Sequence, residues 1–294
     1  MLRQESLPGV AVLGAHEYGP DRIYWRAVLP FIHIGPIELP TFGLMVAVAM
    51  IVAYYVLRAD LARRGIAERD SSTAEMFIVI PSLAGIVGAK LYHVLETPHE
   101  LFADPVGMLL SRYGLAWFGG LIGGFAAWVW LARAKQIPLL ESFDAGSAAA
   151  ALGYGIGRIG CLLSGDGDYG VPTSLPWGMS FPNGLVPTTE RVHPTPIYEL
   201  IAACAIAWVL WRMGTKQTSA RSTANRGGLG PGGVFAAYLI LTGLARFLVE
   251  FIRINPRSFF GMTNAQAASI ASMVAGAALW WHARRNASPA KAPR

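Results

Sequence analysis

The chain has 294 residues, of which 53% are hydrophobic and only 14% are charged, and its net charge is +6. Soluble domains carry about 25% charged residues, so this composition argues against a soluble protein. A basic chain is compatible with nucleic-acid binding, but Lys and Arg in short loops also orient membrane proteins. We therefore predict a membrane protein without a nucleic-acid partner.

The N-terminal part of the chain is mixed in composition, with Pro, Gly and charges of both signs. It lacks a basic start followed by an apolar core, so we do not interpret it as a cleaved signal peptide. We predict that residues 1–40 form an extracytoplasmic segment.

Seven apolar segments follow, and each is long enough to suggest a membrane span. Helices are expected because every backbone donor and acceptor must be paired in lipid. The segments are too long and too continuously apolar for the strands of a membrane barrel. The expected helices cover residues 41–57, 74–95, 115–131, 143–163, 196–211, 233–251 and 265–281.

The loops predict the orientation of these helices. Basic residues such as Arg63, Arg133, Arg212 and Arg285 follow the first, third, fifth and seventh segments, whereas the other loops are mixed in sign. Because basic loops lie in the cytoplasm, we expect the N-terminus outside and the C-terminus inside. The predicted fold is an all-α integral membrane protein with about seven transmembrane helices over residues 41–284, followed by a cytoplasmic tail over residues 285–294.

The longest outer loop covers residues 164–193 and is rich in Pro and Gly. A loop of this length is usually functional or disordered. Trp177 and Phe181 argue against simple disorder, and we expect the loop to lie against the membrane interface.

The fourth segment ends in a glycine-rich stretch that contains a G-x-G-x-x-G pattern from Gly155 to Gly160. A dinucleotide site needs this pattern between a strand and a helix. Here an apolar helix precedes it and a loop follows, so we interpret the glycines as helix-packing residues. The same interpretation applies to four glycines of the third segment, Gly119, Gly120, Gly123 and Gly124.

The two cysteines, Cys161 and Cys204, both lie in apolar segments, without a Cys-x-x-Cys or His/Cys cluster. This pattern predicts neither a disulfide framework nor a metal site. We expect no cofactor. A covalent carrier role for the Cys161 thiol is one hypothesis, and a small core residue is the alternative.

A few charges lie inside the apolar segments, where they are expensive and usually functional. Arg158 is near the outer end of its helix, where it could reach the headgroup layer or bind an anion. Arg246 and Glu250 are four residues apart and share a helical face, so they either pair or form an acid–base unit. With Lys90 and Glu199, these charges predict one polar cavity for an anionic phospholipid headgroup.

Several motifs occur in an order that resembles the prolipoprotein diacylglyceryl transferase family of the bacterial inner membrane. They are FGLM at 42–45, GAKLYH at 88–93, GGLIG at 119–123, GRIG at 157–160, HPTPIYE at 193–199, RFLVE at 246–250 and GMTNAQ at 261–266. The resemblance implies transfer of a diacylglyceryl group from phosphatidylglycerol to the lipobox cysteine of a secreted preprotein, with glycerol phosphate as the leaving group.

The resemblance also implies roles for particular residues. Arg158 and Arg246 would bind the phosphate and stabilise the departing anion. Glu250 would orient an arginine or help to remove a proton, and Asp166 could act as the base. The substrate-binding residues would be Lys90, His193, Tyr198, Glu199, Cys161 and Ser164.

This sequence departs from the family pattern near the expected site. Where the family usually has two asparagines and a glutamate, this chain has Cys161, Ser164 and Asp166. Phe118 stands where the family often has histidine or tyrosine, and Phe42 replaces an aromatic hydroxyl. The sequence thus leaves three hypotheses: a working transferase, a paralogue with altered acceptor chemistry, or a non-catalytic lipid-binding or transport protein.

Overall fold

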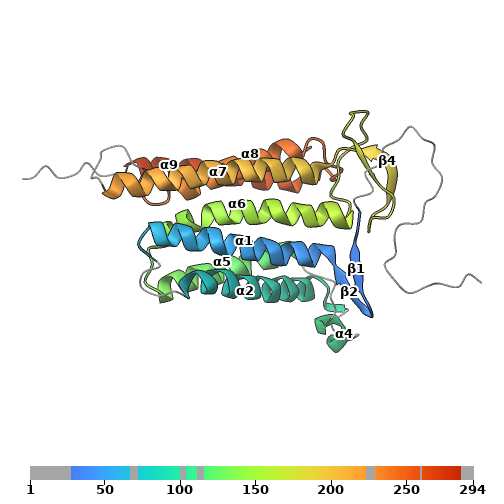
Figure 1. Ribbon diagram of the computed structural model, residues 1–294, viewed down its shortest axis with the longest axis horizontal. Helices are drawn as coiled ribbons and strands as arrows, with labels where there is room; N and C mark the ends of the chain where they lie inside the picture. Colours follow the sequence, from blue (N-terminus) through green and yellow to red (C-terminus); the bar gives the residue numbers. More distant parts are fainter. Residues whose placement is uncertain are drawn as a thin grey trace, which may run out of the picture.

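The computed structural model describes residues 28–66, 72–99, 104–110, 116–222, 229–258 and 260–285. Most of the predicted N-terminal segment and nearly all of the predicted tail lie outside these ranges. The described residues form a bundle of long helices whose axes run side by side (Figure 1). The long helices are α1 (Thr41–Arg63), α2 (Thr73–Glu96), α5 (Trp117–Ala134), α6 (Leu139–Ser164), α7 (Thr195–Ser222), α8 (Gly233–Val249) and α9 (Asn264–Arg285).

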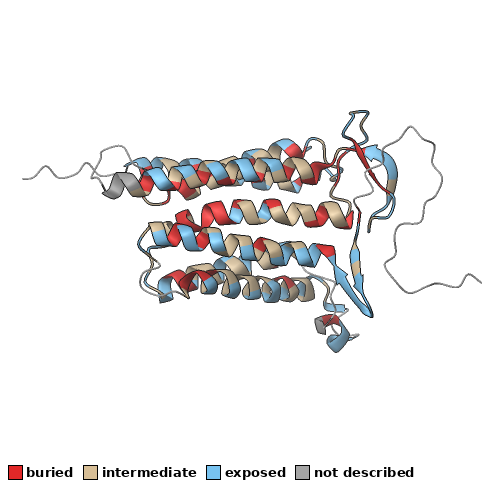
Figure 2. Cartoon of the chain, in the orientation of Figure 1, coloured by how far each residue is buried: buried red, intermediate tan, exposed pale blue. Residues whose placement is uncertain are grey.

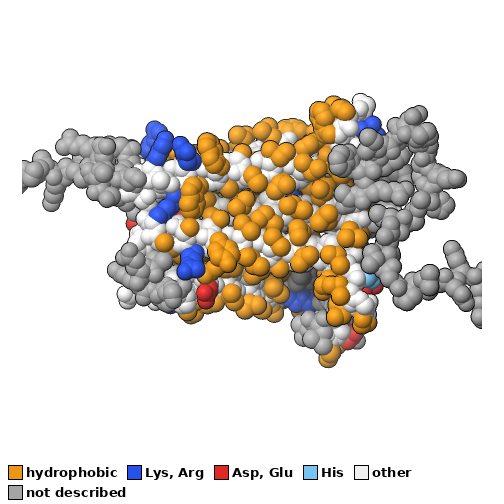
Figure 3. Space-filling view, viewed as in Figure 1, with side chains coloured by type: hydrophobic (Ala, Val, Ile, Leu, Met, Phe, Trp, Pro, Cys, Tyr) orange, Lys and Arg blue, Asp and Glu red, His pale blue; other side chains and the backbone are white. Residues whose placement is uncertain are grey.

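These long helices coincide with the seven predicted apolar segments. Within the described ranges, α1, α2 and α7 are long and apolar enough to cross a membrane, and α8 is a shorter apolar helix. Large hydrophobic side chains also cover the outside of the bundle (Figure 3). The mostly helical membrane fold is therefore confirmed, while the number of spans and their orientation stay predictions.

Short elements gather at one end of the bundle, which we call the head end (Figure 1). They are the hairpin of β1 (Phe31–Ile34) and β2 (Ile37–Pro40), the hairpin of β3 (Met179–Phe181) and β4 (Thr188–Val192), and the helix α4 (Pro105–Leu110). The hairpins lie in the N-terminal segment and in the outer loop, where no strands were predicted. The opposite end carries the basic residues at the C-termini of α1, α5, α7 and α9, and we call it the basic end (Figure 3).

The outer loop is folded rather than disordered. Its hairpin carries a small core in which Phe181 stacks on Tyr169, with 5.2 Å between the ring centroids. Phe181 is therefore buried inside the loop, and the position of the loop against the membrane interface stays a prediction. Trp177 is exposed, as expected for an interfacial residue.

The hydrophobic core of the bundle is concentrated toward the basic end (Figure 2). Leu57 and Leu61 of α1 pack with Phe77 of α2 and Leu131 of α5. A second cluster joins α6, α7 and α8 around Leu210. Between helices in a membrane, such contacts stabilise the bundle mainly through van der Waals packing.

A buried polar network ties four helices together at the basic end. The Asp144 carboxylate accepts hydrogen bonds from the backbone N–H groups of Gly232 (2.9 Å) and Phe235 (2.8 Å), and from Gln217 Nε2 (2.9 Å). Asp144 on α6 thus caps the start of α8. Arg64 donates to Gln217 Oε1 at 2.9 Å and to the buried carboxylate of Asp60 at 2.6 Å, which adds α1.

Glycines allow α2 and α5 to approach closely, as the sequence predicts. A Cβ added at Gly88 would overlap the carbonyl oxygen of Gly119, and one at Gly119 would overlap that of Gly88. The packing interpretation also holds for Gly155, where an added Cβ would lie 2.9 Å from Ala203 Cβ. It does not hold for Gly157, which has open space around the same position.

Gly88→Ala is expected to destabilise the protein by about 1–3 kcal/mol, because the extra methyl group overpacks the contact between α2 and α5. Thermal unfolding of the purified protein in detergent would measure the loss. Gly157→Ala is the matched control, since its methyl group meets no neighbour within 4 Å. Equal melting temperatures for the two variants would contradict the overpacking argument.

Candidate active site

Charged residues from three helices and two loops meet at the head end. The helices α6 and α8 run toward this end, and α7 starts from it, so side chains near their ends come together. We call the resulting group the arginine cluster. It consists of Arg158, Arg246 and Arg253 with the carboxylates Asp168, Glu199 and Glu250.

Glu199 lies at the centre of the arginine cluster and is buried. Its Oε1 accepts a hydrogen bond from Arg246 Nη1 at 2.9 Å and another from the Tyr154 hydroxyl at 2.5 Å. Its Oε2 lies 3.4 Å from both Arg158 Nε and Arg253 Nη1. One carboxylate therefore sets the relative positions of three guanidinium groups.

Asp168 and Glu250 also contact the arginines that surround Glu199. The two carboxylate oxygens of Asp168 accept hydrogen bonds from Arg158 and Arg253. Glu250 Oε2 lies 2.9 Å from Arg246 Nη2, and Asn255 donates to Glu250 Oε1 at 2.5 Å. Arg246 and Glu250 thus do pair with each other, and Glu250 at the same time orients the arginine.

The three arginines differ in their access to a ligand. The side chain of Arg246 is 26% exposed and that of Arg158 is 15% exposed, whereas that of Arg253 is only 7% exposed. Arg253 bonds to the Asp168 carboxylate and lies beside Glu199 and Glu250. Arg158 and Arg246 are therefore the more accessible guanidinium groups of the cluster, and Arg253 is the most enclosed.

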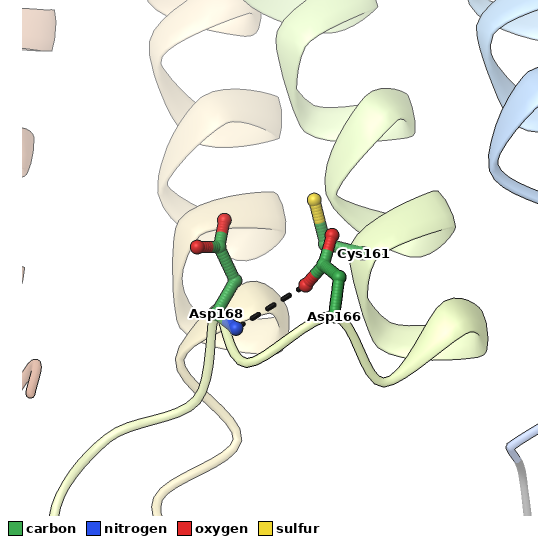
Figure 4. Close-up of side chains that lie close together, drawn as sticks. All are labelled: Cys161, Asp166 and Asp168. Carbon is green, nitrogen blue, oxygen red and sulfur yellow. Dashed lines mark hydrogen bonds between the residues drawn. The ribbon is translucent and has the colours of Figure 1, made fainter. Parts of the chain in front are cut away.

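Cys161, Asp166 and Asp168 lie beside Arg158, and their ligand atoms all fall within 4.8 Å of one another (Figure 4). The Asp168 backbone N–H donates to Asp166 Oδ1 at 3.2 Å, and Arg158 Nη1 lies 3.6 Å from Cys161 Sγ. Two arginines already hold the Asp168 carboxylate. Their positive charge disfavours a metal cation at this point.

The two loop carboxyls have opposite shifts in pKa. Burial raises the pKa of Asp166 above its ordinary value, and the negative charge of Asp168 raises it further. Burial acts on Asp168 in the same direction, but hydrogen bonds and positive charge from Arg253 and Arg158 outweigh it, so the pKa of Asp168 is lowered. Asp166 is thus the carboxyl better suited to accept and hold a proton.

Other predicted site residues lie at the margin of the arginine cluster or away from it. Ser164 is buried at the end of α6, where its hydroxyl donates to the carbonyl of Cys161 at 3.2 Å. Tyr198 lies 3.2 Å from His193 Nδ1 and accepts a hydrogen bond from Trp177 at 2.7 Å, on the side of the outer loop. Lys90 is on α2, which packs on α5 and α1, whereas the arginine cluster is built on α6, α7 and α8.

Three residues of the site were missed by the sequence analysis: Tyr154, Asp168 and Arg253. A signal for Arg253 was present, because Arg246, Glu250 and Arg253 follow one another with the spacing of one helical face. Asp168 lies in a loop, where a carboxylate is ordinary. Tyr154 lies in an apolar helix, where an aromatic residue is ordinary.

The family of the chain follows from comparison with known proteins. The sequence model of a family described as "Prolipoprotein diacylglyceryl transferase" matches residues 30–282. The chain belongs to this family. Three similar proteins, all named phosphatidylglycerol–prolipoprotein diacylglyceryl transferase, come from Geobacter sulfurreducens (32% identity, covering 76% of this chain and 81% of the relative), Clostridium tetani (29%, 80% and 89%) and Corynebacterium glutamicum (30%, 83% and 79%).

Phe42 and Phe118, which the sequence analysis identified as departures from the diacylglyceryl transferase family, lie in different surroundings. Phe42 packs on Gly160 of α6, where it lies 3.1 Å from the position of an added Cβ. Phe118 is exposed at the start of α5 and forms an edge contact with Trp117. Neither ring can transfer a proton, so any acid–base chemistry falls to other residues such as Asp166 and Glu250.

Proposed function

We propose that the chain transfers a diacylglyceryl group from phosphatidylglycerol to the lipobox cysteine of prolipoproteins, as the names of its relatives describe. The observation that carries this proposal is the pair of accessible guanidinium groups, Arg158 and Arg246, held at the ends of apolar helices by a shared carboxylate. The planar guanidinium group binds phosphate through two oxygens. A lipid phosphate is the anion that a membrane supplies at this depth.

The reaction exchanges one bond at a glycerol carbon of the lipid. The substrate thiol loses its proton to a carboxylate of the site. Its sulfur then forms a bond to the carbon of the diacylglyceryl group that is esterified to the phosphate. The bond from this carbon to the phosphate oxygen breaks, and glycerol phosphate leaves with the electron pair. Arg158 and Arg246 would stabilise the charge on the leaving group. Asp166, with its raised pKa, and Glu250 are the candidate proton acceptors.

We further propose an orientation for the chain in the bacterial inner membrane. All seven long helices would cross it, with the N-terminus outside and the C-terminus in the cytoplasm. The basic residues at one end of the bundle support this arrangement (Figure 3). The arginine cluster and the folded outer loop would then face the outer leaflet, where a secreted preprotein presents its cysteine.

A transfer assay would test the proposed function. The purified protein is incubated in nanodiscs that contain phosphatidylglycerol, with a lipobox peptide as acceptor, and the product is detected by mass. We expect a mass increase equal to one diacylglyceryl group, and none with a Cys→Ser acceptor peptide. A folded protein that never modifies the peptide would contradict the proposal.

The changed residues around the cluster favour one alternative function. Cys161, Phe118 and Phe42 stand where the family has polar or protonatable groups, which is compatible with a paralogue that binds phospholipid but has altered or lost acceptor chemistry. Complementation of a bacterium depleted of its own transferase separates the two hypotheses. Rescue supports the transferase, whereas failure to rescue at normal membrane expression supports the paralogue.

Tyr154→Phe is expected to lower kcat/KM for transfer about tenfold. The substitution removes the hydroxyl that donates to Glu199, and hydrogen bonds to charged groups contribute about 1.5–3 kcal/mol. The ring that lies under the Arg158 guanidinium would remain. The matched control is Tyr55→Phe, because Tyr55 is an exposed tyrosine of α1. Equal kinetics for Tyr154→Phe and the wild type would show that the Tyr154 hydroxyl does not contribute to transfer.

Cys161→Ser is expected to keep turnover of the same order as the wild type. In the proposed reaction the nucleophile belongs to the acceptor protein, and the Cys161 side chain lies beside Arg158 and Asp166 without a chemical role of its own. The transfer assay measures this directly, together with a search for a lipid adduct on Cys161 in the wild type. Loss of turnover together with such an adduct would establish the carrier role instead.

A further inference from the structure

The β1–β2 hairpin joins the first long helix without a linker. β2 ends at Pro40 and α1 begins at Thr41, whose backbone N–H and hydroxyl both donate to the carbonyl of Pro30, at 2.9 and 3.1 Å. These bonds fix the base of the hairpin to the start of α1. Because α1 is long and apolar enough to cross a membrane, the hairpin begins where that helix leaves the membrane.

The register of the hairpin sorts its side chains onto two different faces. Residues directly opposite each other in an antiparallel pair share a face, and successive pairs alternate between the two faces. The pairs Ile32–Leu39 and Ile34–Ile37 therefore form one face that is entirely aliphatic. The opposite face carries the pair His33 and Glu38, which bond to each other at 3.0 Å, and the pair Phe31 and Pro40 at the base of the hairpin.

The aliphatic face is uncovered for most of its length. Ile34 is 59% exposed, Ile37 is 56% exposed and Leu39 is 40% exposed. A two-stranded hairpin is at best marginally stable in water when neither face packs on a hydrophobic partner. Contact with an apolar medium would supply the missing stabilisation, at about 25 cal/mol for each Å² of surface.

The direction of the two strands relative to the helices indicates that the apolar medium is the membrane interface. The strands run across the direction of the long helices at the head end (Figure 1). An element with this direction at the end of a membrane-crossing helix lies parallel to the membrane surface. The start of α1, which the hairpin adjoins, also carries exposed apolar side chains, Phe42 and Leu44.

We propose that the β1–β2 hairpin is an interfacial membrane anchor, with the aliphatic side chains in the boundary between headgroups and acyl chains and the His33–Glu38 pair toward water. The hairpin would set the depth of the start of α1 in the bilayer. Because Phe42 of α1 packs on Gly160 of α6, the same contact would fix the depth of Arg158 relative to the lipid phosphates.

Photo-crosslinking tests this anchor in the full chain. The photoreactive residue p-benzoylphenylalanine replaces Ile34 or Ile37 on the aliphatic face, and His33 or Glu38 on the opposite face. Each variant is reconstituted in nanodiscs of phosphatidylglycerol and phosphatidylcholine, irradiated and digested for mass spectrometry. We expect phospholipid adducts at positions 34 and 37, with a yield several-fold higher than at positions 33 and 38.

A second measurement uses the wild-type protein, so that the result does not depend on the folding of any variant. A lipid-soluble diazirine in the same nanodiscs should label Ile34 and Ile37 in preference to His33 and Glu38. Equal labelling of both faces would overturn the proposal. Crosslinks from positions 34 and 37 to residues 1–27, to a second copy of the chain or to an acceptor peptide would also overturn it, because each identifies a different occupant.

Discussion

Arg158→Ala and Arg246→Ala are each expected to abolish transfer of lipid to a lipobox peptide. Removal of one group that stabilises a developing charge lowers kcat by about 10²–10³-fold, and we propose that two groups here act on the same phosphate. Arg158 and Arg246 are the two accessible arginines of the cluster, and both are fixed by Glu199. The transfer assay in nanodiscs measures the loss.

Two further variants show whether this loss is chemical or structural. Arg158→Lys keeps the positive charge but lacks the planar fork, so it should fold normally and remain strongly impaired. Arg212→Ala removes an exposed arginine at the basic end, which lies over Trp208, and should leave transfer unchanged. Full activity in Arg158→Ala or Arg246→Ala would rule out the proposed phosphate-binding role.

The apolar segments predicted the long helices because a membrane-spanning helix must be apolar over nearly its whole length. The same rule explains where the boundaries were wrong. α7 was expected to end near residue 211 but continues to Ser222. The added turns carry Gln217, which is buried through hydrogen bonds to Asp144 and to the carbonyl of Gly230. Hydropathy cannot show a polar residue whose burial depends on partners from other helices.

The hairpins were missed for a different reason. Residues 31–40 alternate too briefly to stand out from the mixed N-terminal segment, and their pairing depends on a turn at Gly35 with a positive φ of 61°. The β3–β4 hairpin lies in a loop whose Pro and Gly content hides its strands. Its core forms only when Phe181 meets Tyr169, twelve residues away in the chain.

The site residues that lie inside apolar segments could be predicted, because burying a charge in a membrane costs free energy. Arg158, Glu199, Arg246 and Glu250 stood out because they interrupt apolar segments, and the structure brings them into one cluster. Asp168 could not be distinguished from other loop carboxylates until the chain folds back and places it against Arg158 and its other partners. Four members of the arginine cluster were thus predicted from the helices, whereas Asp168 could not be, and Lys90 of the predicted cavity lies on α2, away from the cluster.

Asp144→Ala is expected to lower the free energy of unfolding by about 3–5 kcal/mol, the usual result of removing one member of a buried ionic network. The substitution leaves the backbone N–H groups of Gly232 and Phe235 without their acceptor and removes one of the two acceptors of Gln217 Nε2. It also removes the carboxylate that lies 4.0 Å from Arg64. Thermal unfolding in detergent, followed by size exclusion, would measure the loss.

Asp144→Asn separates the two contributions to this loss, because an amide keeps one acceptor oxygen but no charge. We expect Asn to fall between Ala and the wild type. Glu75→Ala removes an exposed carboxylate of α2 and should change stability little. Since the network lies at the basic end, the fraction of Asp144→Ala that stays folded should still transfer lipid. A melting temperature unchanged by Asp144→Ala would show that the basic end is held together by its hydrophobic clusters alone.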